Sequence, residues 1–187
     1  MRTVFQKFLK QCLLIRRSNY GNITNSSFHQ DFKGTPQYYS RYNTFHIEGG
    51  DILNINEHVL AIGISQRTEP DAINGIAHNI FNDPTSPVDT ILAFNIPNNR
   101  AMMHLDTVFT QIDVDKFTIH PGIMGPLSVF EITPEGDGIK VHEINAPLEQ
   151  ILEKYIGMPV TLIPCGGGDR IAAEREQWND GSNTLCI

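Results

Sequence analysis

Two short motifs contain an imidazole and two carboxylates that could act together in acid–base chemistry. His104 and Asp106 lie two residues apart at the start of an apolar run, and Glu48 precedes two glycines in the motif EGGD. Because side chains two apart on a strand share a face, we expect His104 and Asp106 to lie on a strand and point the same way. The glycines allow a sharp turn or a close backbone approach. This set suits binding a planar cation and moving protons near neutral pH.

Each motif also has a purely structural interpretation. A histidine next to an aspartate is more often a structural hydrogen bond, and EGGD by itself indicates a turn. The segment 166–169, GGGD, lacks the Gly-Lys-Ser/Thr ending of a phosphate loop, so we interpret it as a structural loop. Trp178 is expected to anchor packing. The remaining histidines are expected to be solvated or structural: His29, His46, His58, His78, His120 and His142.

Hydrophobic periodicity predicts the elements that must position these residues. We expect a hairpin from strands 52–55 and 59–64, a helix from Asp71 to about Asn82, and a buried strand at 90–96. Further strands are predicted at 104–112, 116–120, 128–133, 160–164 and 184–187, and further helices at 4–13, 148–156 and 174–178. The polar segment 18–33 is predicted to be a loop or disordered. The repeated order strand, strand, helix, strand argues for an α/β or α+β fold.

Composition narrows the class of protein. A chain of 187 residues, with 40% hydrophobic and 19% charged residues, is expected to form one globular domain. A net charge of -7 argues against nucleic acid as a partner, and no run of eighteen apolar residues predicts a membrane span. Cys12, Cys165 and Cys186 are few and widely spaced, which argues against a disulfide framework or a metal site and favours the cytoplasm.

Three segments carry a resemblance to a known family. EGGDILNINEHVLAIGISQRT, MHLDTVFTQID and GGGDRIAAEREQWNDGSNTL resemble successive blocks of arginine deiminase, a member of the guanidino-group-modifying superfamily, in the family's order. The similarity runs from about Gly34 to Ile187, so we divide the chain into a poorly matching helix and loop, 1–33, and a partial catalytic domain, 34–187. The resemblance implies part of a five-bladed propeller of ββαβ modules that hydrolyses L-arginine to L-citrulline and ammonia with no metal or organic cofactor.

The resemblance also implies residue roles. His104 matches the general acid/base of HLD, Asp106 the carboxylate that grips the guanidinium, and Glu48 the glutamate of EGGD that completes the catalytic group. Arg67 matches the arginine of SQRT that binds the substrate α-carboxylate. These roles are chemically sound, because a carboxylate meets a planar guanidinium in bidentate fashion and an arginine suits the carboxylate at the far end of the substrate.

The match has gaps that bear on activity. The family's nucleophilic cysteine, in a segment ending RCMS, and the second clamp aspartate, in FTRD, have no counterpart here, and neither Cys165 nor Cys186 is a convincing substitute. We expect an internal portion of an arginine deiminase that is inactive alone. The alternative is a non-catalytic remnant that binds arginine weakly or serves as a partner surface. We also expect two to three blades, with exposed blade faces that favour self-association.

Overall fold

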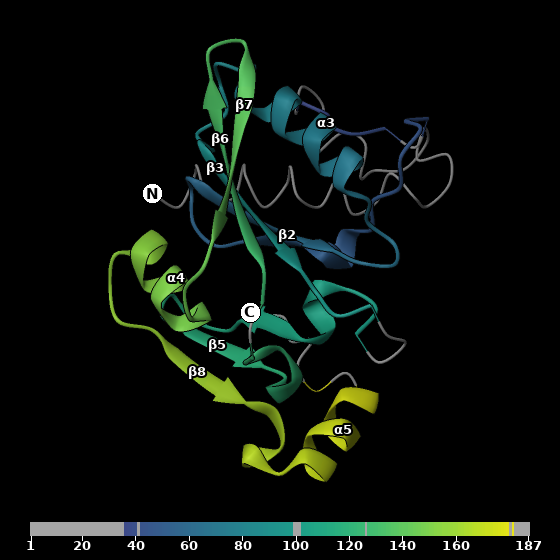
Figure 1. Ribbon diagram of the computed structural model, residues 1–187, viewed down its shortest axis with the longest axis vertical. Coiled ribbons are helices and arrows are strands. Elements are labelled where there is room, and N and C mark those ends of the chain that lie inside the picture. Colours follow the sequence, from purple (N-terminus) through teal and green to yellow (C-terminus); the bar gives the residue numbers. More distant parts are fainter. Residues whose placement is uncertain (1–35, 41, 99–101, 126, 180, 182–187) are drawn as a thin grey trace, which may run out of the picture.

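Two units of the same topology follow each other along the chain (Figure 1). The computed structural model describes residues 36–40, 42–98, 102–125, 127–179 and 181. In the first unit, β1 (Ile52–Asn54) pairs antiparallel with β2 (Val59–Ile64), and β3 (Thr90–Asn95) returns parallel to β2 after helix α3 (Pro70–Phe81). The parallel pair consists of continuous apolar runs, which is typical of strands buried on both faces.

The second unit repeats this order. Strand β4 (Phe109–Gln111) pairs antiparallel with β5 (Lys116–Ile119), and β8 (Thr161–Pro164) returns parallel to β5 after helix α4 (Leu148–Ile156). Helix α4 ends at Gly157, whose φ of 81° is one that glycine adopts without steric cost. The mixed α/β class is therefore confirmed, and the predicted strand, strand, helix, strand order is interrupted in the second unit by a further hairpin before α4.

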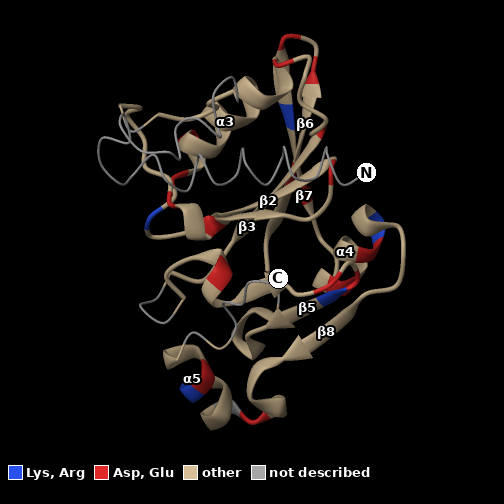
Figure 2. Cartoon of the chain, turned by 180° about the vertical axis from the view of Figure 1, so that it is seen from behind, with Lys and Arg blue, Asp and Glu red and all other residues tan. Residues whose placement is uncertain are grey.

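A hairpin from the second unit extends the sheet of the first. Strands β6 (Val129–Glu135) and β7 (Gly138–Ile144) lie between β5 and α4 in sequence, and β6 pairs antiparallel with β3. The result is a five-stranded sheet, β1-β2-β3-β6-β7, beside a three-stranded sheet, β4-β5-β8. Figure 2 shows acidic residues at the exposed tip of this hairpin. Only β6 was predicted, because the outward-facing polar residues of β7 give no clear apolar signal.

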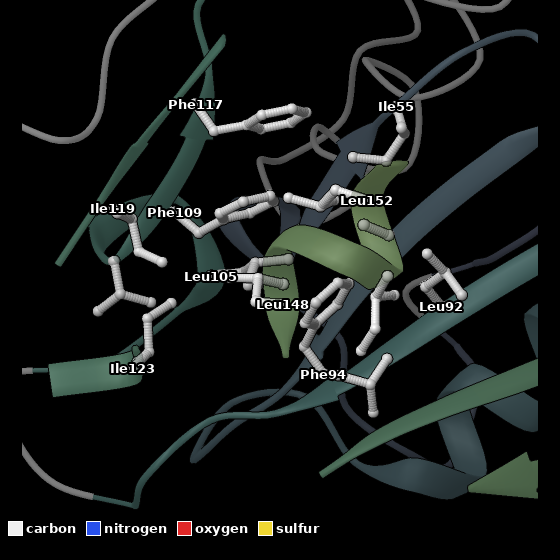
Figure 3. Close-up of a cluster of buried hydrophobic side chains, with 14 of the residues drawn as sticks. Ile55, Leu92, Phe94, Leu105, Phe109, Phe117, Ile119, Ile123, Leu148 and Leu152 are labelled. Atoms are coloured by element: carbon white, nitrogen blue, oxygen red, sulfur yellow. The ribbon is translucent and has the colours of Figure 1, made fainter. Parts of the chain in front are cut away.

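The strand β2 of the larger sheet is buried on both faces. On β2, Leu60 and Ile62 pack in one cluster with α3, whereas Val59 and Ala61 pack in a second cluster with the second unit. Figure 3 shows this second cluster, in which residues of β3, β4, β5 and α4 converge. Stacked rings join the sheets, with centroids 5.8 Å apart for Phe94 and Phe109 and 5.0 Å apart for Phe109 and Phe117. The two units therefore share one core.

Several predicted boundaries were wrong. Helix α3 begins at Pro70, with Glu69 rather than Asp71 at its N-cap, because proline suits the first helical position. Helix α5 (Arg170–Trp178) begins four residues before the predicted Glu174, and Trp178 is 86% exposed rather than a packing anchor. The strand predicted at 104–112 is a short helical turn followed by β4. The elements predicted at 4–13, 18–33 and 184–187 lie outside the described residues.

Within the described part of the chain, no helix is long and apolar enough to cross a membrane.

Candidate functional site

The site is built where each unit begins. Glu48 is the N-cap residue of the 3-10 turn η1 (Gly49–Asp51), which leads into β1. His104 is the N-cap residue of the 3-10 turn η2 (Leu105–Thr107), which precedes β4. The prediction that His104 and Asp106 lie on a strand was therefore wrong. A turn, rather than the alternation of a strand, brings the two side chains to the same side.

The second turn, η2, is anchored in the core by its first residue, Leu105. Leu105 is fully buried in the core shared by the two units, at 0% exposure. The Thr107 hydroxyl donates back to the His104 carbonyl over 2.6 Å, which closes the turn on itself. Burying Leu105 between two polar neighbours fixes the backbone from which His104 and Asp106 project.

Three acid and base side chains meet across the two turns. His104 Nδ1 lies 3.0 Å from Asp106 Oδ1, and His104 Nε2 lies 3.6 Å from Glu48 Oε1. The Asp106 side chain is 9% exposed, that of His104 17% and that of Glu48 32%. The arrangement runs from a buried carboxylate through an imidazole to a carboxylate at the surface. It can hold a cation at its open end and move a proton through the ring.

The hydrogen bond to Asp106 sets the protonation of His104. An ionised carboxylate only accepts, so His104 Nδ1 must donate to it, and Nε2 is then the ring atom that exchanges a proton. This hydrogen bond raises the pKa of His104, burial opposes the rise, and the charges of Asp106, Glu48 and Asp51 add to it. The ring therefore keeps its proton to a higher pH than a solvated histidine does.

Arg67 lies in the same cluster, on the loop after β2. Its Nη1 is 3.0 Å from Glu48 Oε2 and 3.2 Å from Glu48 Oε1, and its Nη2 lies 3.7 Å from Met103 Sδ. Sequence reasoning expected this residue at the far end of a bound substrate. In the structure its guanidinium lies directly on the Glu48 carboxylate.

The close approach of η1 to the His104–Asp106 pair requires glycine at position 50. A Cβ atom at this position would lie 2.9 Å from both carboxylate oxygens of Asp106 and 3.0 Å from His104 Nδ1. Only a residue without a side chain lets η1 approach the His104–Asp106 pair this closely. The close backbone approach expected from the motif EGGD is therefore present.

A pocket opens beside this cluster. Its volume is about 350 Å³, a size that accommodates a small molecule. Glu48 and Arg67 form one wall, and the segment before them forms the rest through Tyr39, Asn43, Phe45, His46 and Ile47. A charged ligand in this pocket would therefore meet the carboxylate of Glu48 and the guanidinium of Arg67.

Comparison with known proteins identifies the family. The arginine deiminase family model matches residues 24–187. The chain belongs to the arginine deiminase family. The match begins earlier than the expected start at Gly34.

Individual arginine deiminases are similar over the same region. The arginine deiminase of Treponema denticola is 62% identical over 164 residues, which are 85% of this chain and 40% of that protein. The arginine deiminase of Clostridium perfringens is 52% identical over 165 residues, with 85% and 40% covered. That of Lentilactobacillus hilgardii is 48% identical over 181 residues, with 92% and 42% covered. The chain thus spans about two fifths of the length of these relatives.

None of the three cysteines stands in an RCMS segment. Cys12 and Cys186 lie outside the described residues, and Cys165 is 6% exposed at the start of the turn η4 (Cys165–Gly168). Among the residues with described positions, no group of three or more His, Cys, Asp or Glu side chains is arranged to hold a metal ion.

Two other predicted features have structural roles. In the segment 166–169, Asp169 accepts hydrogen bonds from Ile171 N and Ala172 N and so caps the N-terminus of α5. His120 is 7% exposed, and its Nδ1 accepts a hydrogen bond from Gly122 N. Burial lowers the pKa of His120, which favours the neutral ring.

Sequence reasoning gave no role to Asp51, the last residue of EGGD. Asp51 is completely buried, and burial raises its pKa against three hydrogen bonds that lower it. The signal was available in the sequence, because an acid placed directly before the apolar strand 52–55 must lie at the edge of the core.

Proposed function

We propose that this chain carries the guanidinium-binding and proton-transfer part of an arginine deiminase site. The observation that carries the proposal is the convergence of Glu48, His104 and Asp106, which come from two separate turns. The reaction of the whole enzyme converts L-arginine and water into L-citrulline and ammonia. In this proposal the carboxylates bind the guanidinium of L-arginine, and His104 moves the protons.

The contact of His104 Nδ1 with Asp106 supports His104 Nε2 as the atom that transfers each proton. His104 Nδ1 is held by Asp106, so His104 Nε2 donates a proton to the departing ammonia and later takes one from the attacking water. The raised pKa of His104 keeps that proton available near neutral pH. A carboxylate accepts several hydrogen bonds, so the contact of Asp106 with His104 is compatible with a second contact to substrate.

Arg67 is proposed to bind the α-carboxylate of the substrate. For this role its guanidinium must leave Glu48, and its half-exposed side chain, at 49%, has solvent into which it can move. The incoming substrate guanidinium would then replace Arg67 on Glu48. The exchange preserves the charge balance at Glu48, because one guanidinium takes the place of another.

The two ββαβ units are proposed to be two successive blades of the family's five-bladed propeller. Support comes from their common topology and from the equivalent placement of η1 and η2 at their starts. In this arrangement residues 34–187 are part of a catalytic domain.

Turnover is a separate question from binding. The sequence contains no RCMS segment, and attack on the amidino carbon requires a nucleophile. We therefore propose that the 187-residue chain alone binds L-arginine without converting it. The alternative is a non-catalytic remnant that binds arginine weakly or serves as a partner surface, and citrulline production by the purified chain would exclude it.

Calorimetric titration of the purified chain with L-arginine tests the proposal. We expect a Kd on the order of 1 mM, weakened roughly tenfold by either Glu48→Gln or Asp106→Asn, because each change removes a charged acceptor worth about 1.5 kcal/mol. Asp113→Asn is the matched control, since Asp113 is an exposed carboxylate paired with Lys116 on the β4–β5 turn. Absence of binding, or equal weakening by Asp113→Asn, would contradict the proposal.

A further inference from the structure

The buried carboxylate of Asp51 reaches three segments of the site. Its Oδ1 accepts from Leu105 N over 2.8 Å, and its Oδ2 accepts from Ser65 Oγ over 2.7 Å and from Thr68 Oγ1 over 2.5 Å. Leu105 belongs to η2, whereas Ser65 and Thr68 belong to the loop after β2. Asp51 itself is the last residue of η1. One carboxylate thus joins the three segments that carry the site residues.

Each residue that donates to Asp51 also contacts, or is adjacent in sequence to, a residue of the site. Thr68 Oγ1 accepts from Glu48 N over 3.0 Å, and Ser65 Oγ accepts from Arg67 N over 3.0 Å. Leu105 lies between His104 and Asp106 in the turn that places both side chains. The three groups that donate to Asp51 are therefore hydrogen-bonded or covalently joined to the backbone of all four site residues, Glu48, Arg67, His104 and Asp106.

The Ser65 hydroxyl requires a hydrogen-bond acceptor at the position of Asp51 Oδ2. Ser65 Oγ already accepts from Arg67 N and from Thr68 N, over 3.0 and 3.1 Å, so both of its lone pairs are engaged and it can only donate to Asp51. An amide in place of the carboxylate would direct an N–H group at this hydroxyl or at Leu105 N. Aspartate and asparagine are therefore not equivalent here, although their shapes are nearly the same.

Strand β2 packs closely against the carboxylate of Asp51 at Gly63. A Cβ atom on Gly63 would lie 2.6 Å from Asp51 Oδ1 and 3.0 Å from Leu105 Cβ. Gly63 stands across from Asp51 because β1 pairs with β2 in a register that joins Ile52 to Ile62. The strand β2 thus presses Asp51 against η2, and the absence of a side chain at Gly63 makes room for the carboxylate.

From these contacts, and resting on the function proposed above, we propose that Asp51 is the positioning residue of the site, which sets the placement of His104 and Asp106 against Glu48 and Arg67. Asp51 does not touch the proposed substrate. It acts through the backbone of η2 and through the hydroxyls of Ser65 and Thr68. Its loss is expected to change the surroundings of His104 before it unfolds the chain.

The pKa of His104, measured by NMR titration of its ring without any ligand, reports this placement. The charged groups that face His104 are Asp106 on its own turn, Glu48 and Asp51 on η1, and Arg67 on the loop after β2 through its ion pair with Glu48. In Asp51→Asn we expect the pKa of His104 to fall toward its ordinary value of 6.5, as the contacts to Asp106 and Glu48 loosen and one charge is lost. An unchanged pKa of His104 would overturn the proposal.

A second pair of variants covers the case in which Asp51→Asn does not fold. Thr68→Val removes one hydroxyl but keeps the carboxylate and the side-chain shape, and we expect it to lower the pKa of His104. Thr68→Ser restores the hydroxyl and is expected to restore that pKa. Failure of Thr68→Val to lower the pKa, or of Thr68→Ser to restore it, would overturn the proposal.

Ile76→Val separates positioning from a general loss of stability. Ile76 is buried in the cluster between α3 and the larger sheet, away from the site residues, so this variant loosens the core without touching the network. It is expected to lower the melting temperature and leave the pKa of His104 unchanged. A fall of that pKa in Ile76→Val equal to the fall in Asp51→Asn would overturn the proposal. L-arginine binding does not enter this test, so failure to bind would count against the proposed function alone.

Discussion

Glu48 and His104 occupy equivalent positions in the two units, and Glu48 Oε1 lies 3.6 Å from His104 Nε2. Each is the residue before a 3-10 turn that precedes the first strand of its unit, and each has an extended backbone. Repetition of one topology thus places an acid from one unit opposite a base from the next. The pairing depends on how the units pack together, which neither motif encodes by itself.

The first prediction concerns the contact between His104 and Asp106. Asp106→Asn is expected to lower the pKa of His104, because the hydrogen bond to this carboxylate is the largest cause of its rise. A ring titration by NMR measures the change, with Asp113→Asn as the control. If Asp106→Asn leaves the pKa of His104 where it is in the original chain, Asp106 does not set the protonation of this ring.

The second prediction separates the two ends of the substrate. Arg67→Ala is expected to weaken binding of L-arginine roughly tenfold, the effect of losing one charged contact, and to weaken binding of agmatine much less, since agmatine lacks the carboxylate. Glu48→Gln is expected to weaken both ligands alike. Titration calorimetry with the two ligands measures the difference. Equal losses for both ligands in Arg67→Ala would mean that Arg67 does not bind the α-carboxylate.

The strands and helices with strong apolar patterns were predictable from the sequence. The hairpin of β1 and β2, the buried strand β3 and the helix α4 each follow from local periodicity, and α4 has the predicted bounds of Leu148–Ile156. The residues Glu48, His104, Asp106 and Arg67 came from motifs. Their meeting in one cluster was an expectation from family resemblance, and the hydrogen bonds and ion pairs now give it physical detail.

Other features depend on tertiary contacts that leave little trace in the sequence. The pairing of β6 with β3 joins residues from different units, and local periodicity does not indicate such a partner. The turn η2 replaces the start of a predicted strand because Leu105 is drawn into the core and its backbone N–H donates to Asp51. The apolar side chain of Trp178 was assigned to the core by its type, although no described neighbour covers it.

The third prediction concerns self-association. Ile171 and Trp178 are 65% and 86% exposed, and their separation of two helical turns places them on one face of α5. We expect the isolated chain to associate through this face, and Trp178→Ser to shift sedimentation toward the monomer. Val141→Ser is the control, because Val141 is 55% exposed on β7. A clean monomer with a cooperative thermal transition in the original chain would contradict this prediction.

The fourth prediction concerns the pH dependence of stability. The pKa of His104 is raised on folding, so its contribution is complete below its ordinary value of 6.5 and is lost as the pH rises through the raised value. The pKa of His120 is lowered, so its contribution is present above 6.5 and is lost as the pH falls through the lowered value.

Urea denaturation between about pH 5 and pH 8.5 separates these opposite contributions. His104→Gln is expected to reduce the loss of unfolding free energy on the alkaline side. His120→Asn, whose amide oxygen can replace the acceptor for Gly122 N, is expected to reduce the loss on the acid side. The reverse assignment of the two sides would show that the protonation of these rings differs from the one inferred from their contacts.

The last prediction concerns the close approach at Gly50. In Gly50→Ala the new methyl group would lie 2.9 Å from both Asp106 oxygens, so η1 or the His104–Asp106 pair must move. We expect a loss of about 1–3 kcal/mol in unfolding free energy, the usual cost of overpacking, together with a lower pKa of His104. Gly75→Ala is the matched control, because no atom lies within 4 Å of a Cβ there and Gly75 is inside α3. This control is expected to gain about 0.5–1 kcal/mol, since alanine is the better helix former. Urea denaturation and NMR titration of the His104 ring in both variants test this prediction. A Gly50→Ala chain with the unfolding free energy and the His104 pKa of the original chain would mean that η1 can move away without disturbing the His104–Asp106 pair.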